Sequence, residues 1–179
     1  MTRIATPSQA DAGRTAPNCD VAACVAEVPD PELPMLTIGD LGILRSVRIE
    51  GSRVLVTITP TYLGCPALAE IRHDIRRRVT DLGHTDVDIC VALSPPWTSD
   101  WITTAGRRKL AAAGLAPPVP AGVRTGPVPI SLAAPKRLVS CPKCGSPDTR
   151  QRAAFASTAC RALYECRSCD EPFEYVKEI

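Results

Sequence analysis

The chain has 179 residues, of which 45% are hydrophobic, and its formal net charge is only +2. The length suits one ordinary domain plus a small module, and the near-zero charge argues against a surface built mainly for a polyanion such as nucleic acid. No apolar run approaches the roughly 20 residues that span a bilayer, and the first 17 residues lack the apolar segment of a secretory signal. We therefore expect a cytoplasmic protein with no membrane partner, whose nine cysteines serve metal or thiol chemistry rather than disulfides.

The first predicted elements are a short helix and a hairpin. Residues 1–17 are expected to form a disordered tail. The segment NCDVAACVAEV then offers Asn18 or Asp20 as a helix cap, and the prolines of PDPELP end the helix. ILRSVRIE and RVLVTITP alternate apolar and polar residues on either side of Gly51 and Ser52, which predicts the two strands of a β-hairpin.

Three further elements complete the predicted first domain. A second helix is predicted to end at Gly83. Its apolar face consists of Leu68, Ile71, Ile75, Val79 and Leu82. DVDICVAL alternates like a strand, with Cys90 buried within it, and the helical crossover should make it parallel to one hairpin strand. One last helix is predicted over residues 98–114. Residues 18–114 thus form a small two-layer α/β (α+β) domain of order α-β-β-α-β-α with a mixed three-stranded sheet.

The segment that follows has no sustained periodicity. Residues 115–139 contain six prolines, so we expect an extended, semi-stiff linker that can also wrap the first domain. Aromatic residues then gather near the C-terminus as Phe155, Tyr164, Phe173 and Tyr175. This concentration predicts a separate small core within residues 140–179.

Two Cys-x-x-Cys pairs lie in this last segment. They are Cys141 with Cys144, and Cys166 with Cys169. Two residues between thiolates let a tight turn direct both sulfurs at one ion, and two such turns complete a tetrahedral site. The segment is too short for a stabilising core, so a metal should supply much of its folding free energy. We expect a zinc-ribbon-like β module with zinc as the default ion, although thiolates also bind iron or an iron–sulfur cluster.

The remaining residues of the module say less about its chemistry. Cys160 is either a small buried residue or an auxiliary thiol that serves as a ligand or reacts. Eight Lys or Arg and six Asp or Glu lie between residues 135 and 179. With four thiolates and one divalent ion the module is near neutral, which disfavours nucleic acid and favours docking to a protein.

Cys65 has the most informative surroundings in the first domain. It precedes Pro66, the expected first residue of the second helix, so the positive helix end should lower the pKa of its thiol. Thr59 and Thr61 end the preceding strand and should share its pocket. From these residues alone Cys65 can ligate a soft metal, attack an electrophile or fill a small space.

Two other features flank this region. Asp30 and Glu32 stand between prolines that rigidify their turn, and they serve either as fixed carboxylates or as solvated acids. Trp97 comes just before the predicted last helix and Trp101 follows four residues later, one turn on and on the same face, where packing against the sheet is the simplest interpretation.

Four long segments together resemble the PaaD (also called PaaJ) family of bacterial phenylacetyl-CoA epoxidase components, from about Val21 to the end. They are VPDPELPMLTIGDLGILRSVRIE, TPTYLGCPA, LSPPWTSDWITTAGRRKLAAAGLAPP and the segment from CPKCGSPDT to CDEPFEYVK. The first domain by itself is similar to the wider SufT-like family of iron–sulfur assembly factors. The hallmarks of that family, an Asp-Pro-Glu turn and a Gly-Cys-Pro before the second helix, fall here on Asp30, Pro31, Glu32, Gly64, Cys65 and Pro66.

The resemblance implies that Cys65 holds iron or a nascent iron–sulfur cluster transiently for transfer. The residues around it in this reading are Thr59, Thr61, Asp30 and Glu32. The implied partners are other epoxidase subunits, namely the di-iron oxygenase or the reductase that carries flavin and a [2Fe–2S] centre. The chain lacks both the pair of Glu-x-x-His motifs that a di-iron bundle needs and a dinucleotide fingerprint. We therefore expect an accessory or maturation component with no catalytic residue of its own.

Two other functions stay open from the sequence. The chain can be an electron-transfer component whose four-cysteine site holds iron, or a zinc-ribbon regulator that binds nucleic acid. A homodimer formed through the sheet edge is a further open question.

Overall fold

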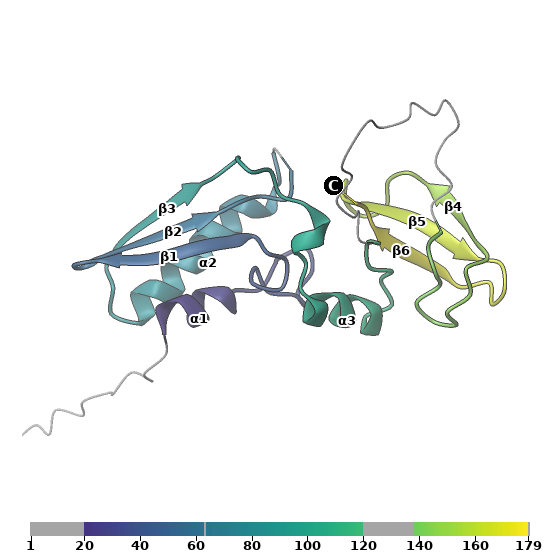
Figure 1. Ribbon diagram of the computed structural model, residues 1–179, viewed down its shortest axis with the longest axis horizontal. Helices are drawn as coiled ribbons and strands as arrows, with labels where there is room; N and C mark the ends of the chain where they lie inside the picture. Colours follow the sequence, from purple (N-terminus) through teal and green to yellow (C-terminus); the bar gives the residue numbers. More distant parts are fainter. Residues whose placement is uncertain (1–19, 63, 120–137, 179) are drawn as a thin grey trace, which may run out of the picture.

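The computed structural model describes residues 20–62, 64–119 and 138–178, and it contains two three-stranded sheets (Figure 1). The first sheet consists of β1 (Leu44–Glu50), β2 (Arg53–Ile58) and β3 (Asp86–Val91), in that order. The second sheet consists of β4 (Thr149–Ala153), β5 (Arg161–Cys166) and β6 (Pro172–Val176). The mixed α+β class and the separate C-terminal β module agree with the sequence-based prediction.

The first sheet has the predicted mixed topology. β1 and β2 are antiparallel and are joined by a turn in which Gly51 has a φ of +63°, while β2 and β3 are parallel. The crossover between the parallel strands is α2 (Ala67–Asp81), and the short α1 (Val21–Ala26) precedes the sheet. Asp20 caps α1, since its carboxylate accepts a hydrogen bond from the N–H of Ala22. These elements confirm the prediction.

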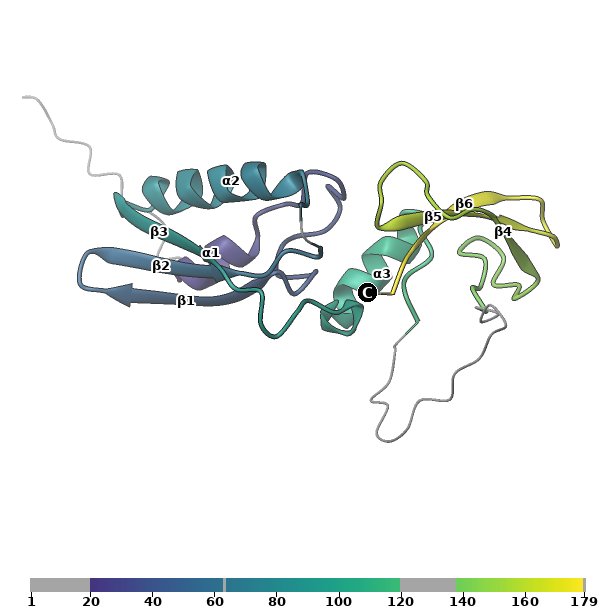
Figure 2. The ribbon, with the colours of Figure 1, turned by 90° about the horizontal axis from the view of Figure 1, so that it is seen from above.

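The core of this unit lies between one face of the sheet and the helices. Alternate residues of β2, namely Val54, Val56 and Ile58, are fully buried and point to the same side. Ile75 and Val79 of α2 are buried in the same cluster. Figure 2 shows α2 lying along one side of the first sheet. The other face carries no helix among the described elements, which explains why Cys90 of β3, predicted to be buried, is exposed.

The predicted last helix of this unit is divided in two, which corrects the single helix expected over residues 98–114. A 3₁₀ turn, η1 (Ser99–Trp101), ends at Ile102, whose backbone is extended, and α3 (Thr104–Ala112) then begins with Thr103 as its cap. The Thr103 hydroxyl accepts from the N–H of Gly106 at 2.9 Å. The backbone N–H of Thr103 donates to the Asp40 carbonyl at 2.8 Å. This long-range bond fixes the break, and local periodicity could not reveal it.

The two tryptophans therefore do not share one helix face. Trp97 is buried and its indole N–H donates to the Leu41 carbonyl at 2.9 Å. Trp101 is only half-buried, and the Arg45 guanidinium lies 3.8 Å from the centre of its ring. Both tryptophans pack against the first core, and the ring of Trp101 also serves as a platform for the Arg45 guanidinium.

The second sheet has its own aromatic core, as predicted from composition. Tyr164, Phe173 and Tyr175 are buried together, and the ring of Tyr164 lies 5.9 Å from Phe173 and 5.5 Å from Tyr175. Phe155 is an exception, since it is 67% exposed and stacks with the Lys177 ammonium instead. All three strands are antiparallel to their neighbours.

The two sheets meet beside α3, which lies between them in both ribbon views (Figures 1 and 2). Leu115 is buried in the first core, and the next residue, Ala116, is buried in the second. The N–H of Ala116 donates to Glu174 and its carbonyl accepts from Val176, so Ala116 pairs with β6. Val176 in turn packs into the first core. The predicted linker thus begins as a joint between the two sheets, and its residues 120–137 lie outside the described residues, as does the predicted tail.

Two further observations complete the fold. Cys24 of α1 takes part in a disulfide, contrary to the expectation that no cysteine would. Within the described residues, no helix has both the length and the apolar character that a bilayer crossing requires.

Candidate functional site

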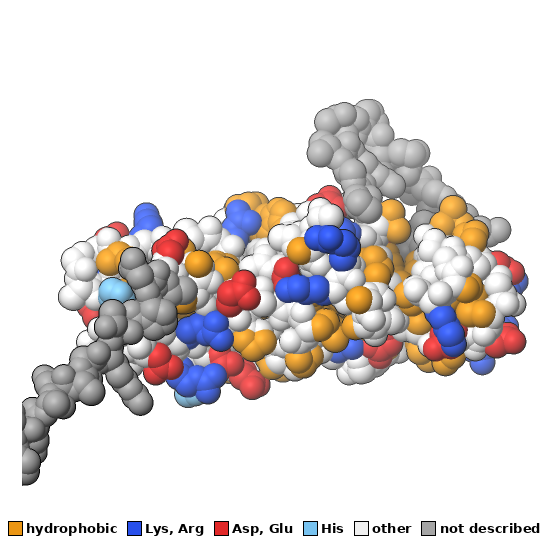
Figure 3. All heavy atoms as spheres, turned by 90° about the horizontal axis from the view of Figure 1, so that it is seen from below, with side chains coloured by type: hydrophobic (Ala, Val, Ile, Leu, Met, Phe, Trp, Pro, Cys, Tyr) orange, Lys and Arg blue, Asp and Glu red, His pale blue; other side chains and the backbone are white. Residues whose placement is uncertain are grey.

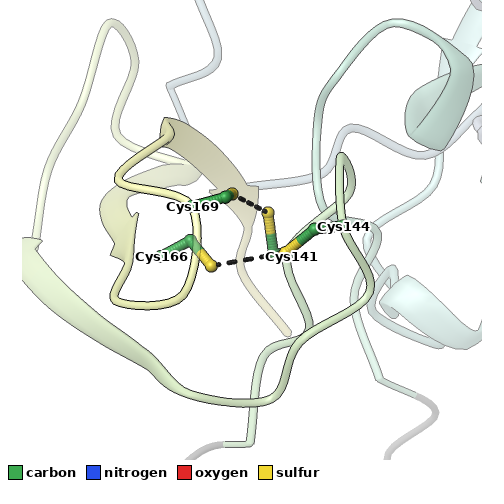
Figure 4. Close-up of side chains that lie close together, drawn as sticks. All are labelled: Cys141, Cys144, Cys166 and Cys169. Atoms are coloured by element: carbon green, nitrogen blue, oxygen red, sulfur yellow. Dashed lines mark hydrogen bonds between the residues drawn. The ribbon is translucent and has the colours of Figure 1, made fainter.

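The four cysteines of the two Cys-x-x-Cys pairs converge on one point of the second unit (Figure 4). Cys141 and Cys144 belong to a turn before β4, while Cys166 ends β5 and Cys169 follows in the next turn. The Sγ atoms of Cys144 and Cys166 are 3.5 Å apart, and those of Cys141 and Cys169 are 3.8 Å apart. All four sulfurs lie within 4.8 Å of one another.

This arrangement fits a tetrahedral metal ion. Zinc–sulfur bonds of about 2.3 Å at tetrahedral angles separate the sulfurs by about 3.8 Å, close to the two distances observed. Cys141 and Cys166 are buried, while Cys144 is exposed, so one edge of the set faces solvent. The four-cysteine set can therefore hold a metal such as zinc.

The electrostatics of the set also call for a cation. Burial raises the pKa of the Cys166 thiol, but the N–H groups of Ser168 and Cys169 donate to its sulfur and lower that pKa to about 7. The Glu171 amide favours the Cys169 thiolate, yet the adjoining sulfurs of Cys144 and Cys166 raise the pKa of Cys169 to about 12. Neighbouring thiolates repel one another, and a divalent ion at their centre allows all four to ionise.

Cys65 lies where β2 leads into α2, as predicted, although the helix begins slightly later. Gly64 has a φ of +85°, which only glycine adopts without strain, and it turns the chain into the helix. The first helical residue is Ala67 and its cap is Pro66. Cys65, expected to be the cap, lies one residue before it. The N–H of Ala67 nevertheless donates to the Cys65 sulfur. One free amide of the helix end therefore does reach the thiol.

The expected lowering of the Cys65 pKa is wrong. Burial raises the pKa of this thiol, and the hydrogen bond from the Ala67 N–H does not offset that effect. The negative charges of Glu32, Asp30 and Cys160 raise it further. Burial thus favours the neutral form of the Cys65 thiol, and a cation placed among Cys65, Asp30 and Glu32 favours their ionised forms.

A small cavity of about 40 Å³ brings most of the predicted residues together. Asp30, Glu32, Thr61 and Cys65 all line it, together with Cys160 from the second unit. Asp30 is 7% exposed, and one oxygen of its carboxylate accepts from the N–H groups of Glu32 and Leu33 at 2.9 and 2.8 Å. These bonds fix the Asp-Pro-Glu turn at the cavity wall.

Thr59 stands apart from this group. It lines a neighbouring and larger cavity of about 260 Å³ with Tyr62, Leu93 and other residues. Thr61 and Trp97 belong to both walls, so the two cavities adjoin. The Thr59 hydroxyl is buried and finds no hydrogen-bond partner in the part of the chain that the structure describes.

Two residues near Cys65 were missed by sequence reasoning. The Tyr62 hydroxyl is hydrogen-bonded to the Cys65 sulfur, and burial, followed by the nearby charge of Cys65, raises the pKa of Tyr62. Its position three residues before the cysteine, in a turn, was the available signal. Arg161 was also missed: its guanidinium donates to the Glu32 carbonyl at 3.1 Å. No local pattern pointed to that contact.

Comparisons with known proteins match the first and the last part of the chain to two different families. Residues 19–91 match a family described as iron–sulfur cluster assembly protein, and residues 125–177 match the PaaD zinc beta ribbon domain. A protein of Escherichia coli (strain K12), provisionally named as the D component of 1,2-phenylacetyl-CoA epoxidase, is 41% identical over 160 residues. The match covers 89% of this chain and 92% of that protein. The chain belongs to the PaaD family.

Two further comparisons concern the first unit. The Fe–S protein maturation auxiliary factor YitW of Bacillus subtilis (strain 168) is 30% identical over 83 residues, which are 45% of this chain and 80% of that protein. A crystal structure of a domain of unknown function, DUF59, from Bacillus anthracis is 26% identical and covers 50% of this chain and 87% of its own, with a TM-score of 0.47. In this PaaD-family chain, Cys65 and its cavity wall from Asp30 to Glu32 lie within the iron–sulfur assembly match.

Proposed function

We propose that the chain is an accessory maturation component of a phenylacetyl-CoA epoxidase system. In this role it assists the loading of iron or an iron–sulfur cluster into the reductase or the oxygenase and performs no oxygenation itself. The observation that carries the proposal is the Cys65 thiol beside the Asp30 and Glu32 carboxylates in one cavity. That cavity belongs to a PaaD-family chain whose residues 19–91 match iron–sulfur assembly proteins.

The chemistry of this cavity suits transient rather than permanent binding. Thiolates bind soft metals, and carboxylates bind harder ones, so the mixed set accepts iron without selecting it as strongly as four sulfurs would. The raised pKa of Cys65 means that metal uptake must displace a proton. That coupling weakens binding at neutral pH and leaves the ion transferable.

The second unit is proposed to contact the client protein and to hold zinc. Its described basic side chains are mostly neutralised by acids. Lys143 pairs with Glu171, Arg150 and Arg152 pair with Glu165, Arg161 pairs with Glu174, and Arg167 pairs with Asp148. Figure 3 shows acidic and basic side chains interspersed on the face in view. Such a surface supports protein docking over nucleic-acid binding.

An electron-transfer component is the second candidate, because four sulfurs in tetrahedral array accept iron as well as zinc. The two functions differ in an observable way. Iron in the four-cysteine site gives a coloured, redox-active protein, whereas zinc gives a colourless one. Elemental analysis of the purified chain, with an absorption spectrum, decides between them, and we expect one zinc per chain.

The maturation role is tested in a strain that lacks this chain. The deletion is complemented with the wild-type chain, with Cys65→Ser, or with Cys90→Ser as a control whose cysteine is exposed on β3. We expect Cys65→Ser to leave iron and acid-labile sulfide in the purified reductase, or iron in the purified oxygenase, at the level of the deletion strain. Growth on phenylacetate should fall in parallel, and Cys90→Ser should restore both.

The proposal is wrong if Cys65→Ser restores metal content and growth as well as wild type. Zinc content and far-ultraviolet circular dichroism of the purified variant provide the folding control.

A further inference from the structure

Cys160 and Cys65 come from distant parts of the chain, yet both line the cavity of about 40 Å³. Cys65 precedes α2 of the first unit, whereas Cys160 immediately precedes β5 of the second. The charge of Cys160 acts on both the Cys65 thiol and the Tyr62 hydroxyl, which places the two thiols in one electrostatic environment. Two cysteines and two acidic residues, Asp30 and Glu32, thus line one cavity.

Contacts on both sides of Cys160 hold it at this position. The next residue, Arg161, donates to the Glu32 carbonyl at 3.1 Å and to the Glu174 carboxylate at 2.6 Å, with its side chain only 12% exposed. The Cys160 carbonyl accepts from the N–H of Lys177 at 2.9 Å. Val176, the neighbour of Lys177, is buried in the first core. The second unit is therefore docked so that Cys160 and the Asp-Pro-Glu turn line the same cavity.

Simple packing does not account for this cysteine. Cys160 is half-buried and belongs to neither hydrophobic cluster of the described residues. Its sulfur lies 3.1 Å from the Thr158 hydroxyl, a polar contact. A cysteine that merely fills space is usually enclosed by apolar side chains.

The carboxylate of Glu32 is available to bind an ion. One Asp30 oxygen is engaged by backbone N–H groups, but the Glu32 carboxylate makes no hydrogen bond or ion pair with any described residue, although it lines the cavity. Only its backbone carbonyl is used, by Arg161. Glu32 can therefore turn its carboxylate toward an ion without breaking an existing contact.

We infer that Cys65 and Cys160 form a two-thiol site for one divalent first-row metal ion at the junction of the two units, with Glu32 as the oxygen donor. That the physiological ion is ferrous rests on the proposed function; the site itself rests on the geometry. Two sulfurs and one carboxylate leave a position for a client ligand, as an ion in transit needs. A cavity of about 40 Å³ has room for an ion and a water or two, on the scale of ~15 Å³ per water. A four-iron cluster does not fit without separating the units.

The binding step balances in protons and charge. The two thiols release two protons to solvent, the two thiolates neutralise the divalent ion, and no electron is transferred. Among the described residues only the four ribbon cysteines already have three or more ligand atoms within 4.8 Å of one another. The junction site therefore closes when the ion arrives, by side-chain rotation of Glu32 and the two cysteines.

The test uses the full chain with its four-cysteine site filled by zinc. Anaerobic titration with Co²⁺, a spectroscopic substitute for Fe²⁺, should show one additional ion per chain with sulfur-to-cobalt charge-transfer absorption. Cys65→Ser and Cys160→Ser should each weaken Co²⁺ binding by at least about 100-fold, because loss of a direct ligand exceeds the 10–100-fold effect of outer residues. Cys90→Ser is the matched control and should bind as wild type.

A second measurement needs no substitution. Iodoacetamide labelling of the zinc-loaded wild-type chain, read by mass spectrometry, should show that Co²⁺ protects both Cys65 and Cys160 while Cys90 is labelled at an unchanged rate. Protection of Cys65 alone, or a Cys160→Ser chain that binds Co²⁺ with wild-type affinity and absorption, overturns the inference. So does a wild-type chain that takes up no additional ion.

The outcomes separate this site from the proposed function. If Co²⁺ requires both thiols but Cys65→Ser still supports cluster loading in cells, the site stands and the maturation role fails. If loading requires Cys65 while Cys160→Ser binds metal normally, the maturation role stands and the two-thiol site fails.

Discussion

The two groups of cysteines in this chain are built in opposite ways. The four-cysteine set takes all its ligands from two short turns of one small sheet, and its sulfurs already stand at metal-binding distances. The cavity at Cys65 takes its lining from the Asp-Pro-Glu turn, from the residues before α2 and from the second unit. Structural metal sites are closed, whereas sites that must exchange a ligand keep a position open. The two proposals accordingly assign a fixed ion to the four-cysteine set and a passing ion to the cavity at Cys65.

The fixed site also helps to position the transient one. In the proposed function, an ion held by the four cysteines would order the turns that flank β5, and residues at the start of β5 contact the first unit, where Arg161 donates to the Glu32 carbonyl. Because of this dependence, removing the fixed ion should disturb both sites. Removing a residue of the junction should leave the fixed ion in place.

The largest effect is expected from Cys166→Ser. Cys166 is fully buried, and its loss should release zinc and unfold the second sheet, because structural zinc supplies about 10–16 kcal/mol of folding free energy in small modules. Zinc content by elemental analysis and the dispersion of the Tyr164 and Phe173 proton signals measure the result. Cys90→Ser should keep one zinc per chain, and a Cys166→Ser chain that does the same would contradict the prediction.

An intermediate effect is expected from Arg161→Met, which keeps a long apolar stem like that of arginine but removes the guanidinium. The Glu32 carbonyl loses this donor, and the Glu174 carboxylate keeps, among the described residues, only its hydrogen bonds from Ser157, which should lower the free energy of unfolding by about 2 kcal/mol. Urea unfolding of the zinc-loaded protein measures this change. Faster hydrogen exchange at the Ala116 and Val176 amides would locate it at the joint.

The matched control for Arg161→Met is Arg152→Met. Arg152 is half-exposed and pairs with Glu165 on the surface, so this change should cost less than about 0.5 kcal/mol. Equal losses for the two variants would show that Arg161 does not hold the units together. Zinc content should be one per chain in both.

The smallest effect is expected from Thr59→Val, and its sign is opposite. The Thr59 hydroxyl is buried without a described partner, so replacing it by a methyl group should raise stability by about 1 kcal/mol. Thr57→Val, two residues earlier on β2, where the side chain is only half-buried, is the control. A loss of stability in Thr59→Val, seen in the same urea titration, would contradict the prediction and mean that bound water satisfies the hydroxyl.

Sequence reasoning predicted the elements that depend on local patterns. The alternation of β2 and the helical spacing from Leu68 to Leu82 identify a strand and a helix because their side chains repeat at the period of the structure. The four cysteines were also found from spacing alone, since each pair forms within one tight turn. The PDPELP turn and the Gly-Cys-Pro before α2 were likewise identified from a few adjacent residues.

The failures concern contacts between distant segments. The helix predicted over residues 98–114 is broken because the Thr103 N–H bonds to Asp40, far away in sequence. The thiol of Cys65 has a raised rather than a lowered pKa because folding buries it beside Asp30, Glu32 and Cys160. A helix end predicts one favourable amide, but it cannot predict the desolvation around it.

For this protein the sequence by itself determined the two sheets, the helix that crosses between parallel strands, and the four-sulfur set, since each arises from residues that are near one another along the chain. Only the tertiary structure decided that Cys160 shares a cavity with Cys65 and that the Arg161 guanidinium donates a hydrogen bond to the Asp-Pro-Glu turn. The physical reason is that these contacts follow from how the second sheet docks on the first core through Ala116 and Val176. That docking depends on complementary surfaces formed only after both units have folded.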